Sequence, residues 1–264
     1  MGTRDTKDQW YANWFNTPYY HILYKDRNHD EAAQFMRKLT QSLSLDPDAH
    51  ILDLACGRGR HSVFLNKLGY RVTGVDLSEN SIAFAKAQLQ QAPSQATPSF
   101  PKLKDLDPSR IHFEVHNMTL PMDQTFDAVF NLFTSFGYFD DEADNLRTIK
   151  AIKANLKPGA SAVIDFMNVD YVIKNLVTKN SKTEQEITFL QSRRYENGYI
   201  FKDIRFTDEG REFKFTERVR ALKLEDFQAY FQEAGLQLVE LYGNYALEDY
   251  CSKTSERLIM VVRG

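Results

Sequence analysis

Cysteines and long apolar runs are scarce in this sequence. Its 264 residues include only two cysteines, Cys56 and Cys251, and they form no Cys-x-x-Cys motif. This usage is typical of a reduced cytosolic protein rather than of a disulfide framework. No segment approaches the roughly 18 apolar residues of a membrane span, and the N-terminus MGTRDTKDQWYANWF lacks the apolar core of a signal peptide. We therefore expect a soluble, cytoplasmic protein.

An excess of charge of either sign is also absent. Lysine and arginine number 33 against 36 aspartates and glutamates, which gives a formal net charge of −3. Such a chain has no overall attraction to nucleic acid or to an anionic membrane, which argues against both as partners. The hydrophobic content of 42% and the length suit one large α/β domain, or one domain with an added subdomain. Nothing in the sequence indicates the oligomeric state.

Apolar runs alternate with helical patterns between residues 47 and 168. The predicted strands are HILDLA, RVTGVDLS, IHFEVHNM, FDAVFNLF and ASAVIDFMN. Helices are predicted between them, one beginning after an N-cap at Ser78 and one ending at Gly159. Continuous apolar strands are typical of a parallel sheet that is covered on both faces. With LQLVELYG and RLIMVVRG as closing strands, the sequence predicts an α/β fold with a doubly wound, mostly parallel, seven-stranded Rossmann-like sheet.

Four further segments flank or interrupt this core. Residues 1–46 carry aromatic side chains at spacings near three to five and are predicted to form an N-terminal helical cap. Residues 91–110 are rich in Pro, Ser and Gln, which indicates a surface insertion. Residues 184–220 alternate apolar and polar side chains around two glycine turns, which predicts an insertion of three antiparallel strands. Residues 221–264 complete the single 1–264 domain with a helix and the closing strands.

The antiparallel insertion is rich in arginine. Its arginines are Arg193, Arg194, Arg205, Arg211, Arg218 and Arg220. Strand alternation could aim some of them at a substrate, which would make the insertion a lid that recognises an anionic small molecule. A solvated sheet face is the simpler interpretation, and both stay open.

A glycine turn follows the first predicted strand. Ile51–Leu54 is apolar apart from Asp53, Gly57 and Gly59 break the run, and a helix is predicted over residues 61–68. A strand, a glycine turn and a helix form a cradle for a phosphate, nucleotide or cofactor, or they form an ordinary tight turn. Asp53 places a charge inside a buried strand, which is expensive unless a partner offsets it.

A second acidic residue ends the next predicted strand. Asp76 lies about 20 residues after the glycine turn, where a carboxylate can accept both hydroxyls of a ribose. A dinucleotide fingerprint would place a third glycine where this sequence has Ser62, so the fit to a pyrophosphate binder is loose. The residues alone leave open a nucleotide-dependent oxidoreductase on a related fold.

The stretch ILDLACGRG resembles motif I of the class I S-adenosylmethionine-dependent methyltransferases at every position. VTGVDLSENSIAFAK is similar to motif II, FDAVFNLFTSFGYF to the motif IV region, and LKPGASAVIDF to the motif of the fifth strand. The combination of CGRGRHS with SFGYF resembles a bacterial group of small-molecule type. The resemblance covers residues 47–168. It implies S-adenosylmethionine as the cofactor and methyl transfer to a small-molecule acceptor.

The resemblance also implies a set of cofactor-binding residues. Gly57 and Gly59 would let the backbone approach the methionyl chain. Asp53 would meet the ammonium group, and Asp76 would bind the ribose. Asn117, where the family often has an acid, would accept from the adenine amine through its side-chain oxygen. The full expected set is Tyr20, Tyr24, Asp53, Ala55, Gly57, Gly59, His61, Asp76, Leu77, Asn117, Met118, Asn131, Leu132 and Phe133.

No residue is identified as catalytic from the sequence. A sulfonium already activates its methyl group, so a base is needed only where the acceptor holds its proton at neutral pH. The candidates near the expected methyl position are Tyr138, Asp165 and Asn168, and no metal site is expected. NLFTSF departs from the Asn/Asp-Pro-Pro-aromatic motif of enzymes that methylate base amines of DNA. A regulatory protein that binds S-adenosylmethionine without turnover stays open.

Overall fold

A computed structural model describes residues 10–24, 29–91, 105–139 and 141–264. The chain divides into two units. The larger unit comprises Asn28–Val172 and Leu222–Gly264, and the smaller comprises Met1–Arg27 and Ile173–Ala221. Each unit has its own sheet and its own hydrophobic core.

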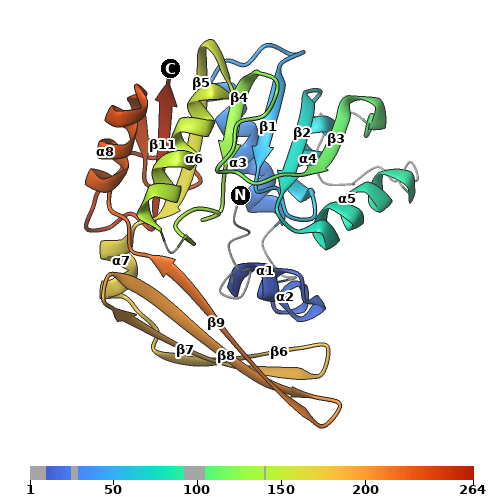
Figure 1. Ribbon diagram of the computed structural model, residues 1–264, viewed down its shortest axis with the longest axis vertical. Helices are drawn as coiled ribbons and strands as arrows, with labels where there is room; N and C mark the ends of the chain where they lie inside the picture. The colour runs from blue at the N-terminus through green and yellow to red at the C-terminus, as the bar shows by residue number, and fades with distance from the viewer. Residues whose placement is uncertain (1–9, 25–28, 92–104, 140) are drawn as a thin grey trace, which may run out of the picture. The chain divides into compact units, whose positions relative to one another are not determined.

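A mostly parallel sheet forms the centre of the larger unit, with its strands in the order β10-β11-β5-β4-β1-β2-β3 (Figure 1). The strands are β1 His50–Leu54, β2 Arg71–Asp76, β3 Ile111–Val115, β4 Phe126–Asn131, β5 Leu156–Met167, β10 Gln237–Tyr242 and β11 Arg257–Arg263. β1 pairs in parallel with β2 and β4, and the parallel pairing continues to β3 and β5. β11 runs antiparallel to β5 and to β10. The predicted seven-stranded, doubly wound sheet is confirmed.

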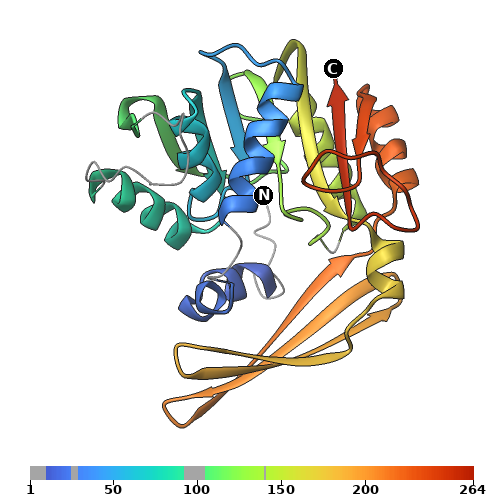
Figure 2. The same ribbon diagram turned by 180° about the vertical axis from the view of Figure 1, so that it is seen from behind.

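Helices cover both faces of this sheet. They are α3 His29–Ser42, α4 Arg60–Lys67, α5 Glu79–Gln91, α6 Glu142–Ala154 and α8 Leu224–Ala234. A 3-10 turn η2 lies at Pro108–Arg110, and α7 Val169–Lys174 begins in this unit after β5 and ends in the smaller one. α3 packs against α4 on one face (Figure 2), and α6 packs against α8 on the other (Figure 1). Phe35, Met36 and Leu39 of α3 are fully buried in the core of the sheet. This core fixes the strands whose ends carry the candidate site.

The smaller unit is built on an antiparallel sheet in the order β6-β7-β8-β9. Its elements are α1 Trp10–Phe15, α2 Pro18–Leu23, β6 Lys179–Glu184, β7 Ile187–Glu196, β8 Tyr199–Asp208 and β9 Arg211–Arg220. The glycine turns predicted at Gly198 and Gly210 are present, but the prediction of three strands missed β6. This edge strand reads KNSKTE and is held by its backbone pairing with β7, so it needs no apolar alternation. Its hairpin turns through Gln185 and Glu186 at φ +46° and +66°, without a glycine to mark it.

The N-terminal aromatic segment contributes to two cores rather than to one cap. α3 belongs to the parallel sheet, whereas Trp14 on α1 is buried in the smaller unit with its ring 4.4 Å from that of Phe215. Glu217 on β9 accepts hydrogen bonds at 2.7 Å from Trp14 Nε1 and from the Tyr24 hydroxyl. An amphipathic pattern shows that a helix covers something apolar but not which sheet it covers, so the sequence could not reveal this division.

Two predictions of helix ends have different outcomes. Ser78 caps α5, because its Oγ accepts from the backbone N–H of Ser81 at 3.1 Å, as expected. The helix expected to end at Gly159 ends instead at Ala154. The chain leaves that helix at Asn155, whose side-chain oxygen accepts a backbone N–H from outside the helix at 2.8 Å. Gly159 therefore lies inside β5.

The predicted surface insertion at residues 91–110 falls largely outside the described residues, which omit 92–104. Within the described part, Asp107 caps η2 by accepting from the backbone N–H of Ser109 at 3.0 Å. Asn66 of α4 accepts from the backbone N–H of Asp107 at 2.8 Å. These bonds attach the end of the segment to the larger unit.

Gly59→Ala tests how tightly the turn before α4 is packed. Gly59 has a φ of +78°, and an added Cβ would lie 2.4 Å from Cζ of Phe113. We expect the free energy of unfolding to fall by about 2 to 4 kcal/mol, from left-handed strain plus this clash. Gly159→Ala is the matched control, because Gly159 has a φ of +76° in the same unit but open space around the added Cβ; it should lose about 1 kcal/mol. Denaturant titration followed by circular dichroism measures both, and equal losses would show that Phe113 moves aside.

Candidate cofactor site

The ends of three strands meet at one edge of the parallel sheet. β1 lies between β2 and β4, and all three strands run in the same direction. The sheet extends from β1 to β3 on one side and from β4 to β5 on the other, so the border between β1 and β4 is the topological switch point. Ligands of doubly wound folds bind outside the carboxyl ends of the strands at that point. Most of the predicted site residues follow these strand ends.

The glycine turn after β1 has left-handed backbone at three positions. Ala55, Gly57 and Gly59 have φ values of +66°, +56° and +78°. A Cβ added at Gly57 would meet no atom within 4 Å, whereas one added at Gly59 would strike Phe113. The two glycines therefore differ, because Gly59 is required by packing inside the protein and Gly57 borders open space. The expected close approach to a ligand fits Gly57 rather than Gly59.

Asp76 holds the glycine turn from the end of β2. Its Oδ2 accepts from the backbone N–H of Gly57 at 2.9 Å, and its Oδ1 accepts from the backbone N–H of Ser78 at 2.8 Å. Burial raises the pKa of Asp76, and these two backbone bonds oppose the rise. Each carboxylate oxygen has a second acceptor site, so Asp76 can bind ligand hydroxyls while it holds the turn.

Asp53 is buried on β1, with 3% of its surface exposed. Ser62 Oγ donates to Asp53 Oδ2 at 2.5 Å. Burial raises the pKa of Asp53 to about 6, and the bond from Ser62 opposes the rise. The partner that a buried charge requires is thus the serine that replaces a third glycine. This geometry supports a link between β1 and α4 rather than the expected contact with a ligand ammonium group.

β4 ends in Asn131, which is fully buried. Its Nδ2 donates to the carbonyl of Leu54 at 3.0 Å and so ties the end of β4 to the end of β1. Its Oδ1 has no hydrogen-bond partner among the described residues. A buried acceptor without a donor is costly, and this oxygen is enclosed where the ends of β1 and β4 are tied together. Leu132, the next residue, is also buried.

An aromatic stack borders the site beyond β4. The rings of His61 on α4 and Phe133 lie 4.3 Å apart with an angle of 11° between their planes. His61 Nε2 lies 2.8 Å from Arg60 Nη2. Arginine only donates, so Nε2 is the acceptor and the ring proton sits on Nδ1. His61 therefore serves as a packing and hydrogen-bonding residue.

The ends of β2 and β3 carry the residues expected to meet an adenine ring. Leu77 is 41% exposed, and Met118 is partly exposed. The expectation for Asn117 is not supported, because its Oδ1 already accepts from the backbone N–H and the hydroxyl of Thr119, both at 3.0 Å. The amide nitrogen of Asn117 is the group that remains to bind a ligand.

Tyr20 and Tyr24 lie in the smaller unit. The ring of Tyr20 lies 4.9 Å from the rings of Phe15 and Tyr24. The Tyr24 hydroxyl donates to Glu217 at 2.7 Å and accepts from Lys202 Nζ at 2.5 Å. The structure thus gives both tyrosines a role in the core of this unit, and their contact with the methionyl end of a cofactor stays a prediction.

The three candidates for acid–base chemistry all bond within the protein. Asp165 on β5 is fully buried and pairs with Arg257 at 2.7 Å; burial raises its pKa, and Arg257 opposes the rise. Asn168 donates to two backbone carbonyls of the loop before β11, at 2.9 and 2.7 Å. The Tyr138 hydroxyl donates to a backbone carbonyl of its own loop. All three side chains hold backbone segments together.

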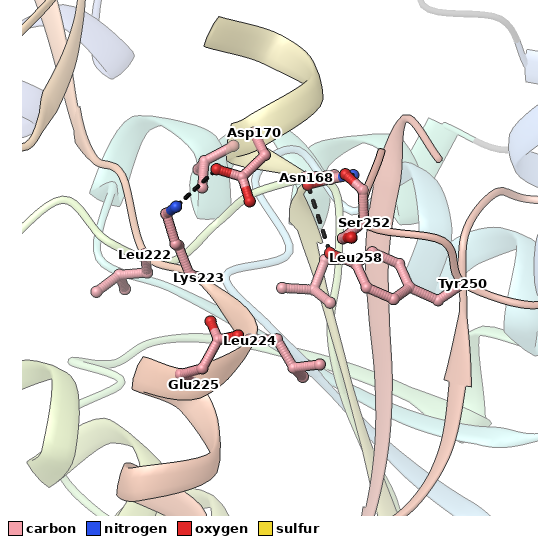
Figure 3. A pocket seen from close by; sticks show the side chains of 10 residues that line it. Asn168, Asp170, Leu222, Lys223, Leu224, Glu225, Tyr250, Ser252 and Leu258 are labelled. Carbon is pink, nitrogen blue, oxygen red and sulfur yellow. Dashed lines mark hydrogen bonds and ion pairs between the residues drawn. The ribbon is translucent and has the colours of Figure 1, made fainter. Parts of the chain in front are cut away.

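A small pocket of about 50 Å³ lies where the chain leaves β5 (Figure 3). Asn168, Tyr250 and Leu258 line it, and Lys223 pairs with Asp170 at 2.7 Å beside it. This volume admits a water molecule but not a nucleoside. The pocket is therefore distinct from the candidate cofactor site.

Sequence reasoning missed two residues that contact Asp165. Arg257 and Tyr245 both bond its carboxylate, Tyr245 through its hydroxyl at 3.2 Å. A charge inside a predicted strand indicates that a partner exists, but Arg257 follows 92 positions later and no local pattern joins the two. Among the described residues, no group of three or more His, Cys, Asp or Glu side chains could hold a metal ion, and no helix is long and apolar enough to cross a membrane.

The raised pKa of Asp53 predicts a pH dependence of stability. A carboxyl group whose pKa is higher in the folded protein than the ordinary 3.8 stabilises the fold when it is protonated. This contribution is complete below pH 3.8 and is lost as the pH rises through about 6. Between pH 7 and pH 5, the unfolding free energy of the wild type should therefore rise by about 1 kcal/mol more than that of Asp53→Asn.

Urea titrations at the two pH values measure this difference. Asp127→Asn is the control, because its bonds to the His50 backbone and to Lys157 outweigh burial and lower its pKa. Its contribution changes only below the ordinary carboxyl range, so this variant should follow the wild type between pH 7 and pH 5. A wild type and an Asp53→Asn variant with the same pH dependence would contradict the assignment.

Comparisons with known proteins agree with this geometry. A family model for a methyltransferase domain matches residues 51–159. A putative methyltransferase from Geobacillus is 25% identical over 96% of this chain and 98% of its own, and rat glycine N-methyltransferase is 28% identical over 63% and 59%. The solved structure of an S-adenosylmethionine-dependent methyltransferase from Clostridium acetobutylicum matches with a TM-score of 0.74 and 21% identity, covering 95% of this chain and 98% of its own. Residues 51–159 therefore match a methyltransferase domain, and the protein is an S-adenosylmethionine-dependent methyltransferase.

Proposed function

We propose that this methyltransferase acts on an amine nitrogen of a small molecule. The observation that supports the cofactor site is the open, left-handed position at Gly57, held by Asp76. The name of the rat relative, glycine N-methyltransferase, supports an amine as the acceptor. The net charge of −3 supports a small acceptor over a long nucleic acid, whose binding depends on many basic side chains.

Five residues are proposed to hold the cofactor. Gly57 would admit the methionyl chain, and Asp76 would accept from the ribose hydroxyls. Asn131, whose Oδ1 has no donor among the described residues, would hold the end of β4 beside the methionyl group through its bond to Leu54. Leu77 and Met118 would lie against the adenine ring through their exposed apolar atoms. When bound, the cofactor supplies a methyl group that its sulfonium has already activated.

The wall formed by Leu132, Phe133 and His61 is proposed to keep water from the reacting methyl group. Leu132 is buried, and the stacked rings of Phe133 and His61 present little polar surface. The face of an aromatic ring attracts cations, so this wall suits a sulfonium. Its role would be to hold the approach geometry and to exclude water.

Tyr138, Asp165 and Asn168 are proposed to position the site rather than to transfer protons. Each side chain forms hydrogen bonds within the protein. An amine needs no dedicated base if its neutral fraction reacts, because that fraction already carries a free electron pair. This is a simpler requirement than that of a hydroxyl acceptor, which must lose its proton during transfer.

The smaller unit is proposed to govern the choice of acceptor, with its antiparallel sheet as the lid predicted at residues 184–220. Its arginines are not equivalent. Arg194 pairs with Glu196 at 3.2 Å and with Asp203, and Arg193 donates to Asn180 at 2.6 Å. These two are bound within the sheet, as a solvated face would have them. Exposed arginines that could meet an anionic acceptor include Arg205 and Arg211.

Asp76→Ala should weaken cofactor binding at least tenfold. The substitution removes the proposed acceptor of two ribose hydroxyls, and bonds to a charged acceptor contribute about 1.5 to 3 kcal/mol each. It also releases the backbone N–H of Gly57 from its carboxylate partner. Isothermal titration with S-adenosylhomocysteine measures the affinity. Asp127→Ala is the matched control at the opposite end of the sheet, where Asp127 also bonds a backbone N–H; it should bind normally. A folded Asp76→Ala variant with unchanged affinity would reject the ribose assignment.

Paired acceptors test the amine assignment. The wild type is incubated with methyl-labelled S-adenosylmethionine and with pairs that differ in one group, such as glycine against glycolate and an amino sugar against its parent sugar. We expect the amine of a productive pair to be methylated at least about tenfold faster than the hydroxyl compound, because Tyr138, Asp165 and Asn168 already bond within the protein. Asp76→Ala should lower the transfer to every acceptor. Faster transfer to the hydroxyl compounds would replace the amine assignment with an oxygen acceptor.

A further inference from the structure

A buried ion pair lies beside the end of β4. Arg257, the first residue of β11, donates to Asp165 Oδ1 through Nε at 2.9 Å and through Nη2 at 2.7 Å. The Asp165 side chain is fully buried and that of Arg257 is 18% exposed. A buried ion pair contributes little net stability compared with apolar side chains of the same size. The role of this ion pair therefore depends on the other groups that Asp165 and Arg257 bond.

The pair holds Phe133 and Thr134, the second and third residues after β4. Asp165 Oδ2 accepts from the backbone N–H of Phe133 at 2.8 Å, and the Asp165 carbonyl accepts from the backbone N–H of Thr134 at 3.0 Å. Arg257 Nη2 also donates to Thr134 Oγ1 at 2.9 Å. One aspartate and one arginine thus bind both backbone N–H groups and the side chain of this two-residue step.

Phe133 and Thr134 both have left-handed backbone, with φ values of +58° and +60°. Residues with a Cβ rarely adopt this region, and a β-branched threonine does so least readily. Strained positions of this kind persist only where the surrounding contacts determine them, and they cluster at functional sites. The contacts that determine this one come from Asp165 and Arg257.

The left-handed backbone at Phe133 and Thr134 sets the direction of the Phe133 ring. Phe133 stacks on His61 at 4.3 Å and also lies 5.2 Å from the ring of Tyr245, whose hydroxyl bonds Asp165 Oδ2 at 3.2 Å. The same carboxylate therefore fixes the backbone of Phe133 and one of the rings that flank it. Release of the carboxylate would free the backbone of Phe133 and the Tyr245 ring beside it.

We propose that Asp165 and Arg257 are positioning residues for the cofactor site. They hold Phe133 and Thr134 in the left-handed conformation and thereby fix the ring of Phe133 against His61. This inference rests on the proposed cofactor site at the ends of β1 and β4. Asp165 and Arg257 act through Phe133 and transfer no proton, because they form an ion pair with each other inside the protein.

Arg257→Met tests the inference by calorimetry with S-adenosylhomocysteine. We expect affinity to fall about tenfold or more at a temperature where circular dichroism shows a folded protein. Arg257→Lys should lose less, since it keeps the charge but cannot bond Asp165 and Thr134 together. Arg263→Met is the matched control on the same strand, where the arginine is exposed and contacts Ser161 at 3.4 Å; it should bind normally.

A second substitution separates positioning from general stability. Glycine adopts a φ near +60° without strain, so Thr134→Gly added to Arg257→Met should recover at least half of the lost affinity on a logarithmic scale. A purely structural ion pair predicts no such recovery. If Arg257→Met does not fold, Thr134→Val is used, because it removes only the hydroxyl that Arg257 binds; it should weaken binding about threefold with an unchanged melting temperature.

Amide hydrogen exchange tests the contacts that Asp165 and Arg257 make with Phe133 and Thr134, without any cofactor. The backbone N–H groups of Phe133 and Thr134 should exchange at least tenfold faster in Arg257→Met, or in Thr134→Val for the neighbouring Phe133, while the amides of β1 keep their wild-type rates. A wild type that binds no S-adenosylhomocysteine would reject the proposed function and this inference with it. If the wild type binds S-adenosylhomocysteine, three results for folded Arg257→Met would overturn this inference and leave the proposed function intact. They are unchanged affinity, unchanged amide exchange, or no recovery of affinity on adding Thr134→Gly.

Discussion

The site depends on the parallel pairing of β1 with β2 on one side and with β4 on the other. This pairing brings the turns that follow β1, β2 and β4 to one edge of the sheet. Ala55, Gly57, Phe133 and Thr134 all take left-handed backbone there. Since most residues resist this conformation, each turn needs a specific partner. Polar side chains at this edge therefore serve first to fold the turns.

The same requirement explains why the site is rich in buried acids. Asp53, Asp76 and Asp165 each have a pKa raised mainly by burial, and Asp76 adds to the rise at Asp53. Arg257 offsets the charge of Asp165 directly. A ligand with a positive sulfonium would offset the unpaired charge, whereas a pyrophosphate would add to it. The electrostatics of the turns thus favour S-adenosylmethionine over a dinucleotide, in agreement with Ser62 at the third glycine position.

The parallel sheet and the glycine turn could be predicted from the sequence because their signals are local. A strand buried on both faces is apolar along its length, and a turn next to a ligand requires glycine. Asp165 and Arg257 could not be paired, because 92 positions separate them. β6 was missed because backbone pairing alone defines a polar edge strand. The bonds of the Asn117 oxygen to Thr119 could not be predicted, because they form in a local turn that a family pattern does not show.

The connections between the two units suggest how the catalytic core and the choice of acceptor can be kept apart. The chain leaves the larger unit near Asp170 and returns near Lys223, and these two residues form an ion pair at 2.7 Å (Figure 3). The points at which the chain leaves and re-enters the larger unit are therefore adjacent, and β6–β9 between them contribute to a separate core. None of the strands whose ends carry Gly57, Asp76 or Asn131 lies between those two points. The proposed cofactor residues and the proposed acceptor sheet thus lie in separate units of the chain, as our proposal for the smaller unit requires.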